Sequence, residues 1–271
     1  MPNPSPPPHA CSSSATLFET PIPKWGNYRA RLSARTWLDQ DRALEDPDER
    51  ETRRAERLQE LEAAIGRIEA LIDFFGPTTE RLNLLGSANK RKSLVAPVRE
   101  RMDVLGEAQD QYREARRHAL ESTGVEDFLS LTNCLAISVV RRLRGGGTPP
   151  DDVEFRRTYE AAQSLLLESE EELHPFFGTS APAELELIRS LRAGTLDQEV
   201  QAIGDGYEAA FRRAGSVGEL ASTLDQLSFF IEMLRVDSDE AADFRVRNRE
   251  LRERVVPALE ALRGRLAGLA G

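Results

Sequence analysis

The sequence is poor in the residues that build disulfide frameworks and metal sites. It has two cysteines and three histidines among 271 residues. Cys11 lies in a segment rich in proline and serine and Cys134 lies in an apolar run, so a reducing, cytoplasmic setting fits better than a disulfide framework. The histidines, His9, His118 and His174, are far apart and have no second ligand at metal spacing. We therefore expect neither a metal nor another cofactor.

Long apolar segments and a positive charge balance are absent as well. The longest apolar candidate, residues 125–143, contains four charged side chains that a bilayer interior would not tolerate unpaired. The first fifteen residues have no basic start and no apolar stretch, so we expect no secretory signal. With 36 basic and 46 acidic residues, the net charge of −10 repels phosphate backbones. We expect no binding to membranes or nucleic acids.

Groupings typical of catalysis are also scarce. His174 follows Glu170, Glu171 and Glu172, a pattern that fits a solvated helix end better than an acid–base cluster. Cys134 has no base nearby in the sequence, so we interpret it as a small buried side chain. Gly145–Gly147 lacks the Lys-Ser/Thr of a phosphate loop. The sequence therefore predicts a protein that is not an enzyme.

What the chain does contain is helical periodicity. No run of β-branched residues alternates over the length of a strand, so we predict an all-α fold of roughly nine to eleven helices. Residues 1–14 are too poor in large apolar groups to offset the entropy of ordering, and we expect a disordered tail there. Residues 15–144 and 151–271 then form N-terminal and C-terminal helical repeats, joined by a Gly/Pro linker at 145–150.

Prolines, glycines and hydroxyl residues mark the expected helix ends. The first helix should begin near Gly26, and a second should start at Pro47, whose missing N–H costs nothing in the first turn. Gly76-Pro77 should end this second helix, with Thr78 or Thr79 capping the next. Leucine, isoleucine and phenylalanine at steps of three and four predict one buried stripe on the second helix: Leu58, Leu61, Ile65, Ile68, Ile72 and Phe75. Further breaks are expected at Thr123-Gly124, Gly145 to Pro150, Pro175 with Gly178, Ala193 to Thr195, Gly215-Ser216 and Asp237-Ser238, and Pro257 should kink or start the last helix.

Three segments share an internal pattern. An apolar residue, a tyrosine and an alanine occupy the first, fifth and eighth positions of 108–115, 155–162 and 203–210, and the tyrosines recur after 47 and then 48 residues. In a helix this spacing places all three side chains on one stripe, where the small alanine lets a neighbouring helix approach closely. Short strings of this kind also arise by chance in helices rich in alanine, but chance explains the regular spacing poorly. The positions concerned are Ala108, Tyr112, Ala115, Tyr159, Ala162, Tyr207 and Ala210.

The pattern resembles the second helix of a tetratricopeptide (TPR) repeat, and Leu82, Leu85 and Gly86 resemble the start of its first helix. The stretch Glu80 to Arg91 is similar to the Glu-Arg-x-x-Leu-Leu-Gly-Ser-Ala-Tyr-Lys-Arg signature of the divergent TPR-S group, and Phe128-Leu-Ser-Leu-Thr-Asn133 is similar to its Tyr-Pro-Leu-Thr-Asn stretch. Bacterial members accompany caspase-like CHAT proteases and other effectors of anti-phage systems. The resemblance spans about residues 55 to 235 and implies a stack of helix pairs that binds protein partners.

Two departures qualify this resemblance. Asn89 stands where the signature has an aromatic residue, and the interval from Gly86 to Ala108 is about ten residues longer than in the usual repeat of about 34. A HEAT-like stack fits the spacing as well. The standard concave mode of peptide binding is therefore not assured by the sequence.

One loop could also be a processing site. Arg144 and Gly145 begin a run of glycines and prolines, an exposed, flexible type of segment that proteases cut. The alternative is a plain linker whose arginines balance the dipole of the preceding helix.

The function predicted from these features is a non-catalytic TPR-like adaptor or regulator of a partner protein, such as a caspase-like protease of an anti-phage system. Two alternatives stay open. One is a substrate or inhibitor that releases an effector when cleaved, and the other is a structural helical bundle or coiled coil. The partner and the oligomeric state are not fixed by the sequence.

Overall fold

A computed structural model describes residues 21–145, 152–168, 175–235 and 246–270 of the chain. All regular structure in these ranges is helical, which confirms the predicted all-α class. Two short 3₁₀ turns, Asp41–Ala43 and Gly268–Ala270, accompany ten α-helices. These are α2 (Pro21–Asp39), α3 (Pro47–Phe75), α4 (Thr79–Val95), α5 (Arg101–Thr123), α6 (Phe128–Arg144), α7 (Asp152–Glu168), α8 (Pro175–Ala193), α9 (Leu196–Ala214), α10 (Val217–Leu234) and α11 (Val246–Ala267).

Several helices begin or end at the residues that the sequence predicts. Pro47 is the first residue of α3, and the Asp46 side chain caps it by accepting hydrogen bonds from the backbone N–H groups of Asp48 and Glu49. Gly76 ends α3 with a φ of 81°, a conformation that costs glycine little. Thr78, one of the two predicted caps, accepts a hydrogen bond from the Arg81 N–H at the start of α4. Breaks also fall where predicted after Thr123, Arg144, Ala193 and Ala214.

Two predicted boundaries are wrong. α2 begins at Pro21 rather than near Gly26, because proline is tolerated in a first turn, where backbone N–H groups have no partner within the helix. α8 begins at Pro175, where a break was predicted, but Gly178 lies inside this helix. Pro257 lies inside α11, which excludes a helix start there and leaves the predicted alternative, a kink. Packing of the surrounding helix outweighs the local preference of a single glycine or proline. The predicted break at Asp237-Ser238, the predicted tail 1–14 and the linker residues 146–150 lie outside the described residues.

The apolar stripe of α3 faces α2 and α4. Leu61, Ile65 and Ile68 are buried in a cluster with Trp37 of α2 and Leu85 of α4. Leu58 and Ile72 pack at the edge of this cluster. The prediction that Phe75 belongs to the buried stripe is wrong, because Phe75 is the last residue of the helix and is 46% exposed. The stripe therefore serves packing within the chain, which removes the sequence argument for a free-standing coiled coil.

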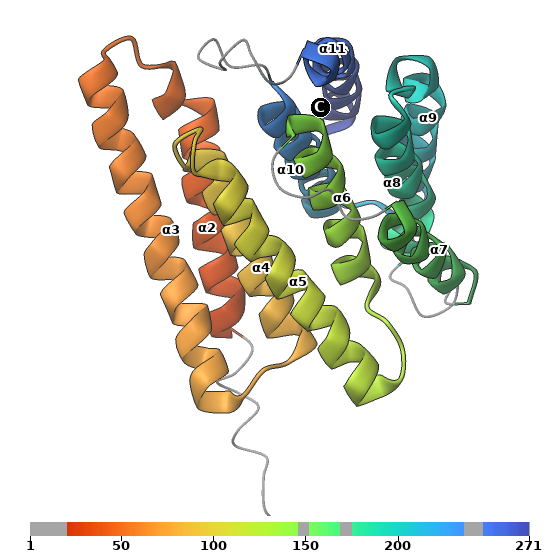
Figure 1. Cartoon of the computed structure of the whole chain (residues 1–271), viewed down its shortest axis with the longest axis horizontal. Coiled ribbons are helices and arrows are strands. Elements are labelled where there is room, and N and C mark those ends of the chain that lie inside the picture. The colour runs from red at the N-terminus through yellow and green to blue at the C-terminus, as the bar shows by residue number, and fades with distance from the viewer. Residues whose placement is uncertain (1–20, 146–151, 169–174, 236–245, 271) are drawn as a thin grey trace, which may run out of the picture.

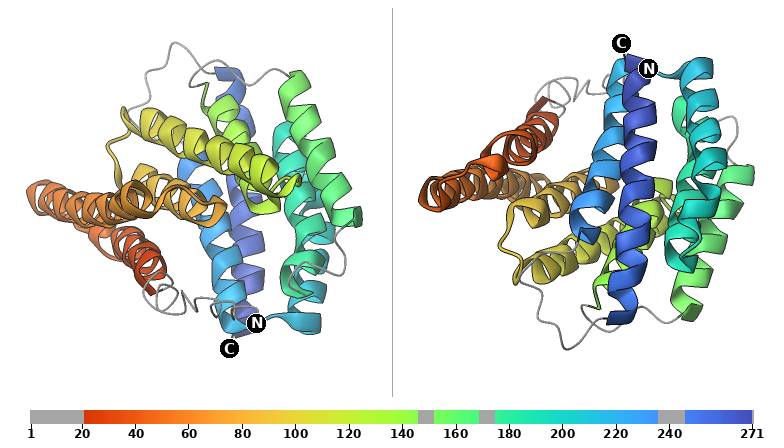
Figure 2. Two further views of the ribbon diagram at one scale, coloured as in Figure 1. Left: turned by 90° about the horizontal axis from the view of Figure 1, so that it is seen from below. Right: turned by 90° about the horizontal axis from the view of Figure 1, so that it is seen from above.

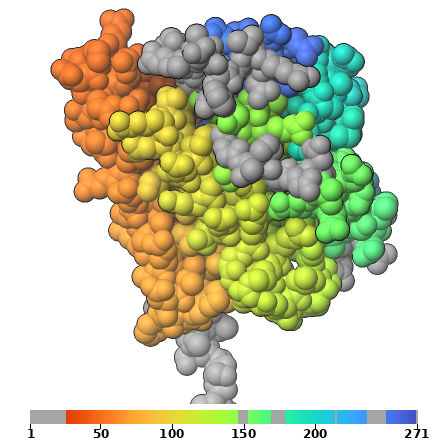
Figure 3. Space-filling model, viewed as in Figure 1, coloured from red at the N-terminus to blue at the C-terminus, as the bar shows by residue number. Residues whose placement is uncertain are grey.

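Consecutive helices form neighbouring pairs, α2 with α3, α4 with α5, α6 with α7, α8 with α9 and α10 with α11. Figure 1 shows the helices of the first two pairs running side by side, connected by short turns. Successive pairs also touch, since α3 packs on α4, α5 on α6, and α7 on α8. In the space-filling view of Figure 3, α5 (yellow) separates the orange surface of the N-terminal helices from the green and blue surfaces of later ones.

The buried apolar side chains form two clusters. The smaller one joins α2, α3 and α4. The larger one extends from Leu94 of α4 to Leu266 of α11 and includes residues on both sides of the segment 145–150. The expected division between N-terminal and C-terminal repeats at this linker does not coincide with a break in the larger cluster.

Helix α10 returns to the N-terminal half. It packs on α11 and also on α4 and α6, which precede it in the chain by more than seventy residues. Both views of Figure 2 show α10 and α11 (blue) between the red-to-yellow helices and the green-to-teal helices. The pairs therefore do not form a simple open stack, because α10 closes it against earlier pairs.

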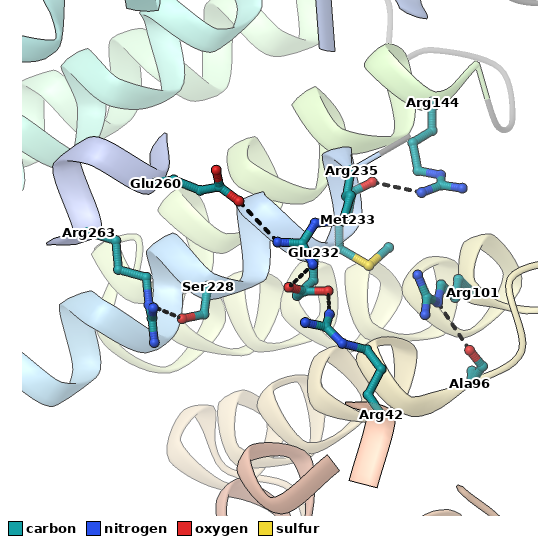
Figure 4. A network of polar contacts seen from close by, with 10 residues as sticks. All are labelled: Arg42, Ala96, Arg101, Arg144, Ser228, Glu232, Met233, Arg235, Glu260 and Arg263. Carbon is teal, nitrogen blue, oxygen red and sulfur yellow. Dashed lines mark hydrogen bonds and ion pairs between the residues drawn. The ribbon is translucent and has the colours of Figure 1, made fainter. Parts of the chain in front are cut away.

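Arginines from α6, α11 and the 3₁₀ turn Asp41–Ala43 hold the C-terminal end of α10. Arg144 of α6 donates a hydrogen bond to the Met233 carbonyl, and Arg252 of α11 donates to the carbonyls of Leu234 and Arg235. Arg42, just after α2, forms an ion pair with Glu232. Figure 4 shows Arg144 and Arg42 reaching this end of the helix from different sides. Cations are favourable here because backbone carbonyls without partners make the C-terminus of a helix negative.

Within the described ranges, no helix combines the length and the apolar character needed to cross a bilayer.

Candidate functional site

The residues of the predicted repeat signature lie on the expected helices. Tyr112, Tyr159 and Tyr207 are on α5, α7 and α9, the second helix of three successive pairs. Tyr112 and Tyr207 are 2% and 3% exposed, whereas Tyr159 is only partly buried. The other signature residues, Leu82, Leu85, Gly86, Ala108, Ala115, Ala162 and Ala210, are all buried.

Tyr112 packs directly on the glycine of its partner helix. A Cβ atom added to Gly86 of α4 would lie 3.1 Å from three ring atoms of Tyr112, closer than ordinary van der Waals contact. The absence of a side chain at Gly86 thus makes room for the ring, and burial raises the pKa of the Tyr112 hydroxyl. Glycine and tyrosine, 26 residues apart in the sequence, act as one packing unit between α4 and α5.

The other two tyrosines have different surroundings. The Tyr207 hydroxyl donates a hydrogen bond to the Glu184 Oε2 atom of α8 at 2.5 Å. Tyr159 stacks on Phe155 of its own helix, with ring centroids 6.1 Å apart. Burial raises the pKa of its hydroxyl, the charge of Glu186 on α8 raises it further, and the charge of Arg189 on α8 lowers it. Tyr112 and Tyr207 therefore face the first helix of their own pair, whereas Tyr159 is influenced by the pair that follows.

A groove lies between the N-terminal helices and α10. We call it the central groove; it is a cavity of about 740 Å³ with walls from α2, α4, the start of α6 and α10. Because these elements come from both halves of the chain, the site exists only when α10 is folded back. Its lining includes Asn27, Arg31, Leu38, Asn83, Leu84, Lys90, Arg91, Leu94, Asp127, Leu129, Asn133, Leu224, Asp225 and Gln226.

Lys90 lies at the floor of the central groove. Its Nζ atom donates hydrogen bonds to Asn133 Oδ1 at 2.8 Å and to Gln226 Oε1, and it lies 4.4 Å from the centroid of the Phe229 ring. Burial lowers the pKa of Lys90 to about 7, while the charges of Glu184 and Asp225 oppose that shift. The lysine thus ties α4 to α6 and to α10 at one point.

The polar contacts of Lys90 continue into the C-terminal half. Gln226 Nε2 donates to Glu184 Oε1 at 3.0 Å, and the other carboxylate oxygen of Glu184 accepts from Tyr207. Burial raises the pKa of Glu184, and the hydrogen bonds from Tyr207 and Gln226 and the charge of Lys90 counteract this rise. A connected series of side chains therefore joins α4, α10, α8 and α9 beneath the groove. Each buried polar group in it has a partner, as a buried network requires.

The mouth of the central groove lies where α4 and α6 begin. Asn83 Nδ2 donates to Asp127 Oδ2 at 2.9 Å, and Asp127 caps α6 by accepting from the Ser130 N–H at 2.8 Å. Leu129 is 54% exposed beside this polar contact. The mouth thus combines an exposed apolar side chain with amide and carboxylate groups.

The predicted cleavage loop is only partly exposed. Arg144 is 2% exposed, and its guanidinium is held at the end of α10, so the expectation of an exposed arginine there is wrong. The physical reason is that the negative C-terminus of α10, distant in sequence, binds the cation. Gly145 is exposed, and 146–150 lie outside the described residues. Cleavage after Arg144 stays a prediction, one that requires this side chain to leave its contact.

Side chains capable of catalysis are dispersed. The Cys134 thiol is buried, and burial raises its pKa to about 12, which keeps it protonated. His118 Nδ1, near the end of α5, lies 3.3 Å from the hydroxyl of Thr79, the first residue of α4. Across the ranges that the structure describes, no three His, Cys, Asp or Glu side chains gather closely enough to hold a metal. His9, His174 and Glu170 to Glu172 lie outside these ranges.

The central groove was not predicted from the sequence. Polar residues at steps of four and three on α4, Asn83, Ser87 and Lys90, were a usable signal, because they share one side of a helix otherwise rich in buried apolar residues. The contribution of α10 had no local signal, since Lys90 and Gln226 are 136 residues apart.

The fold and the groove define an all-helical protein with a cavity of about 740 Å³ between packed helix pairs. Comparisons with family models, with curated proteins and with solved structures find no match for this chain.

Proposed function

We propose that this chain is a non-catalytic helical-repeat adaptor that binds a segment of a partner protein in the central groove. The observation that carries the proposal is the groove itself, a cavity of about 740 Å³ formed by helices from both halves of the chain. Cavities of this size between helices are typical of ligand sites. Stacked helix pairs also offer extended surfaces to proteins.

The chemistry of the lining suits a peptide. Asn83, Asn133 and Gln226 line the groove with carboxamide groups, and their hydrogen bonds to Asp127, Lys90 and Glu184 fix the shape of this wall. Leu84, Leu129 and Leu224 provide apolar contacts in the same groove. A groove with apolar contacts suits an amphipathic segment, which buries its apolar side chains there.

The resemblance to TPR-S proteins supplies the proposed setting. It supports a partner that is a caspase-like protease, or an effector controlled by one, in a bacterial anti-phage system. The adaptor role would then be to hold or regulate that partner, and the chain itself would contribute no catalytic group.

The proposal is tested by capture of a partner with groove and control variants. Proteins encoded by neighbouring genes are incubated with the purified full chain, with Leu129→Arg and with Leu167→Arg. Leu129 is exposed in the groove, whereas Leu167 is 81% exposed on α7, outside it. We expect Leu129→Arg to weaken capture by about tenfold or more and Leu167→Arg to leave it unchanged, since a charge in an apolar contact costs roughly 1.4 kcal/mol or more. Equal capture by all three proteins would exclude the central groove.

A second candidate function is a substrate or inhibitor that is switched by cleavage after Arg144. The specific observation in its favour is that Arg144 both precedes the predicted loop and binds the end of α10. Cutting there would free the residue that holds α10 against α6. Incubation with a neighbouring caspase-like protease, followed by mass spectrometry, distinguishes this function, because an intact chain would leave only the adaptor role.

A further inference from the structure

The floor of the central groove has an excess of positive charge. Arg31 of α2 and the adjacent Lys90 and Arg91 of α4 all line the cavity. From the opposite wall, α10 contributes one carboxylate, Asp225, whose Oδ2 atom lies 2.5 Å from Arg31 Nε. Arg31 and Arg91 thus face a single anionic side chain, Asp225, across the groove, whereas Lys90 is also stabilised by the charge of Glu184.

The other acidic groups nearby are occupied or peripheral. Asp127 caps α6 and accepts from Asn83 at the mouth. Glu80 and Asp39 are exposed at the rim. Glu184 lies behind the floor, where Tyr207 and Gln226 bind both of its oxygens. Glu184 offsets the charge of Lys90, whereas Asp225 is the acidic group that favours the charged form of Arg91.

The cations of the floor are poorly solvated. Lys90 is 9% exposed, and Arg91 is half-buried, held by the Asn27 Oδ1 and Ser87 Oγ atoms, each at 2.6 Å. Burial lowers the pKa of both groups, whereas the charges of Glu184 and Asp225 favour the charged form of Lys90 and the charge of Asp225 favours that of Arg91. Charges removed from water need nearby opposite charge, and the single carboxylate of Asp225 does not balance both Arg31 and Arg91.

Arg31 also keeps hydrogen-bonding capacity in reserve. Its Nη2 atom is buried and has no hydrogen-bond partner among the described residues, although the guanidinium lies beside Asp225. A planar guanidinium is suited to binding a carboxylate through two nitrogen atoms. The arginine is therefore in place for a further acceptor.

We propose that the floor of the central groove is a carboxylate subsite, that the bound segment of the partner carries an aspartate or glutamate there, and that Asp225 competes with it from within the chain. This inference rests on the proposed function, because it names the chemistry of the segment that the groove receives. A carboxylate is favoured over the phosphates of a nucleic acid because the chain carries a net charge of −10 and acidic side chains at the rim.

Two synthetic peptides of equal length test the subsite. One alternates leucine with aspartate, and the other has asparagine in place of each aspartate; both carry a fluorescent label. Binding to the full chain, to Asp225→Asn and to Asp73→Asn is measured by fluorescence anisotropy. Asp73 is exposed on α3, is not among the residues that line the groove, and serves as the matched control with the same change of charge.

We expect the natural chain to bind the aspartate peptide about tenfold more tightly than the asparagine peptide, because a close charge pair at an interface contributes at least this much. Asp225→Asn should tighten binding of the aspartate peptide several-fold and leave binding of the asparagine peptide unchanged, whereas Asp73→Asn should change neither. Equal binding of the two peptides, absence of binding by both, or no gain with Asp225→Asn would overturn the subsite. Tighter binding of a labelled single-stranded oligonucleotide than of the aspartate peptide would also overturn it.

The failure of this inference can be told apart from the failure of the groove. If partner capture depends on Leu129 but the peptides do not distinguish aspartate from asparagine, the groove stands and only the carboxylate subsite falls. If capture is insensitive to Leu129→Arg, the groove itself is excluded.

Discussion

Replacing Gly86 by alanine tests the packing unit between α4 and α5. The new methyl group would lie 3.1 Å from three atoms of the buried Tyr112 ring. Favourable carbon contacts begin near 3.5 Å, so the ring or the helix must move, and overpacking of this kind costs about 1–3 kcal/mol. Alanine also favours a helix over glycine by about 1 kcal/mol, which offsets part of that cost.

Gly66 of α3 provides the matched control. It is exposed in the middle of a helix, and an added Cβ atom would meet nothing within 4 Å. Gly66→Ala should therefore increase the free energy of unfolding by about 0.5–1 kcal/mol through helix propensity alone. Because the propensity gain is common to both substitutions, their difference isolates the contact with Tyr112. We expect Gly66→Ala to be more stable than Gly86→Ala by about 1–3 kcal/mol.

The assay is urea denaturation followed by circular dichroism at equal protein concentration. A second background, Tyr112→Leu, removes the ring, so that Gly86→Ala should there become stabilising and the two substitutions should show a coupling free energy. If Gly86→Ala and Gly66→Ala were equally stabilising in the natural background, the close approach of α4 and α5 at this point would be refuted.

Two further predictions concern buried side chains. Tyr207→Ala should lower the free energy of unfolding by about 3–5 kcal/mol, because a buried ring and its bond to Glu184 are lost. Tyr159→Ala should cost only about 1–2 kcal/mol, since this ring is partly exposed; equal losses in urea denaturation would contradict the difference in burial. Lys90 has a pKa of about 7 in the folded protein, below its ordinary value of 10.5, so the unfolded chain binds more protons between these values and stability should rise with pH across this window. Lys90→Met should lose that slope when urea denaturation is compared at about pH 6 and about pH 9, and an unchanged slope would show that other groups cause it.

Local signals in the sequence predicted much of the secondary structure. Asp46, Pro47, Gly76 and Gly124 lie at helix ends because each satisfies or relieves the backbone of its own neighbours. The spacing of apolar residues at three and four positions was enough to predict the buried part of the α3 stripe. It could not show that Phe75, at the end of this helix, is exposed. Sequence patterns of this kind report on a few residues at a time.

The arrangement of α10 could not be predicted in this way. Arg144 looked like the exposed start of a linker because the carbonyl of Met233 that binds it lies 89 residues later in the chain. The burial of Lys90 had no local signal, because Gln226, which binds it, lies 136 residues later in the chain. The central groove depends on these distant pairings, and no periodicity in the sequence encodes which of many arginines or lysines will meet a given helix.

The return of α10 onto α4 and α6 sets a limit on how this architecture can grow. An open array lengthens by duplication, because a new unit needs only a neighbour on one side. Here the contacts of Lys90 and Arg144 fix the distance between α4, α6 and α10, so a duplicated pair inserted after α6 would carry α10 away from its position. Homologous chains should therefore vary in length before α4 or within surface turns. They should keep a constant number of helices from α4 to α10.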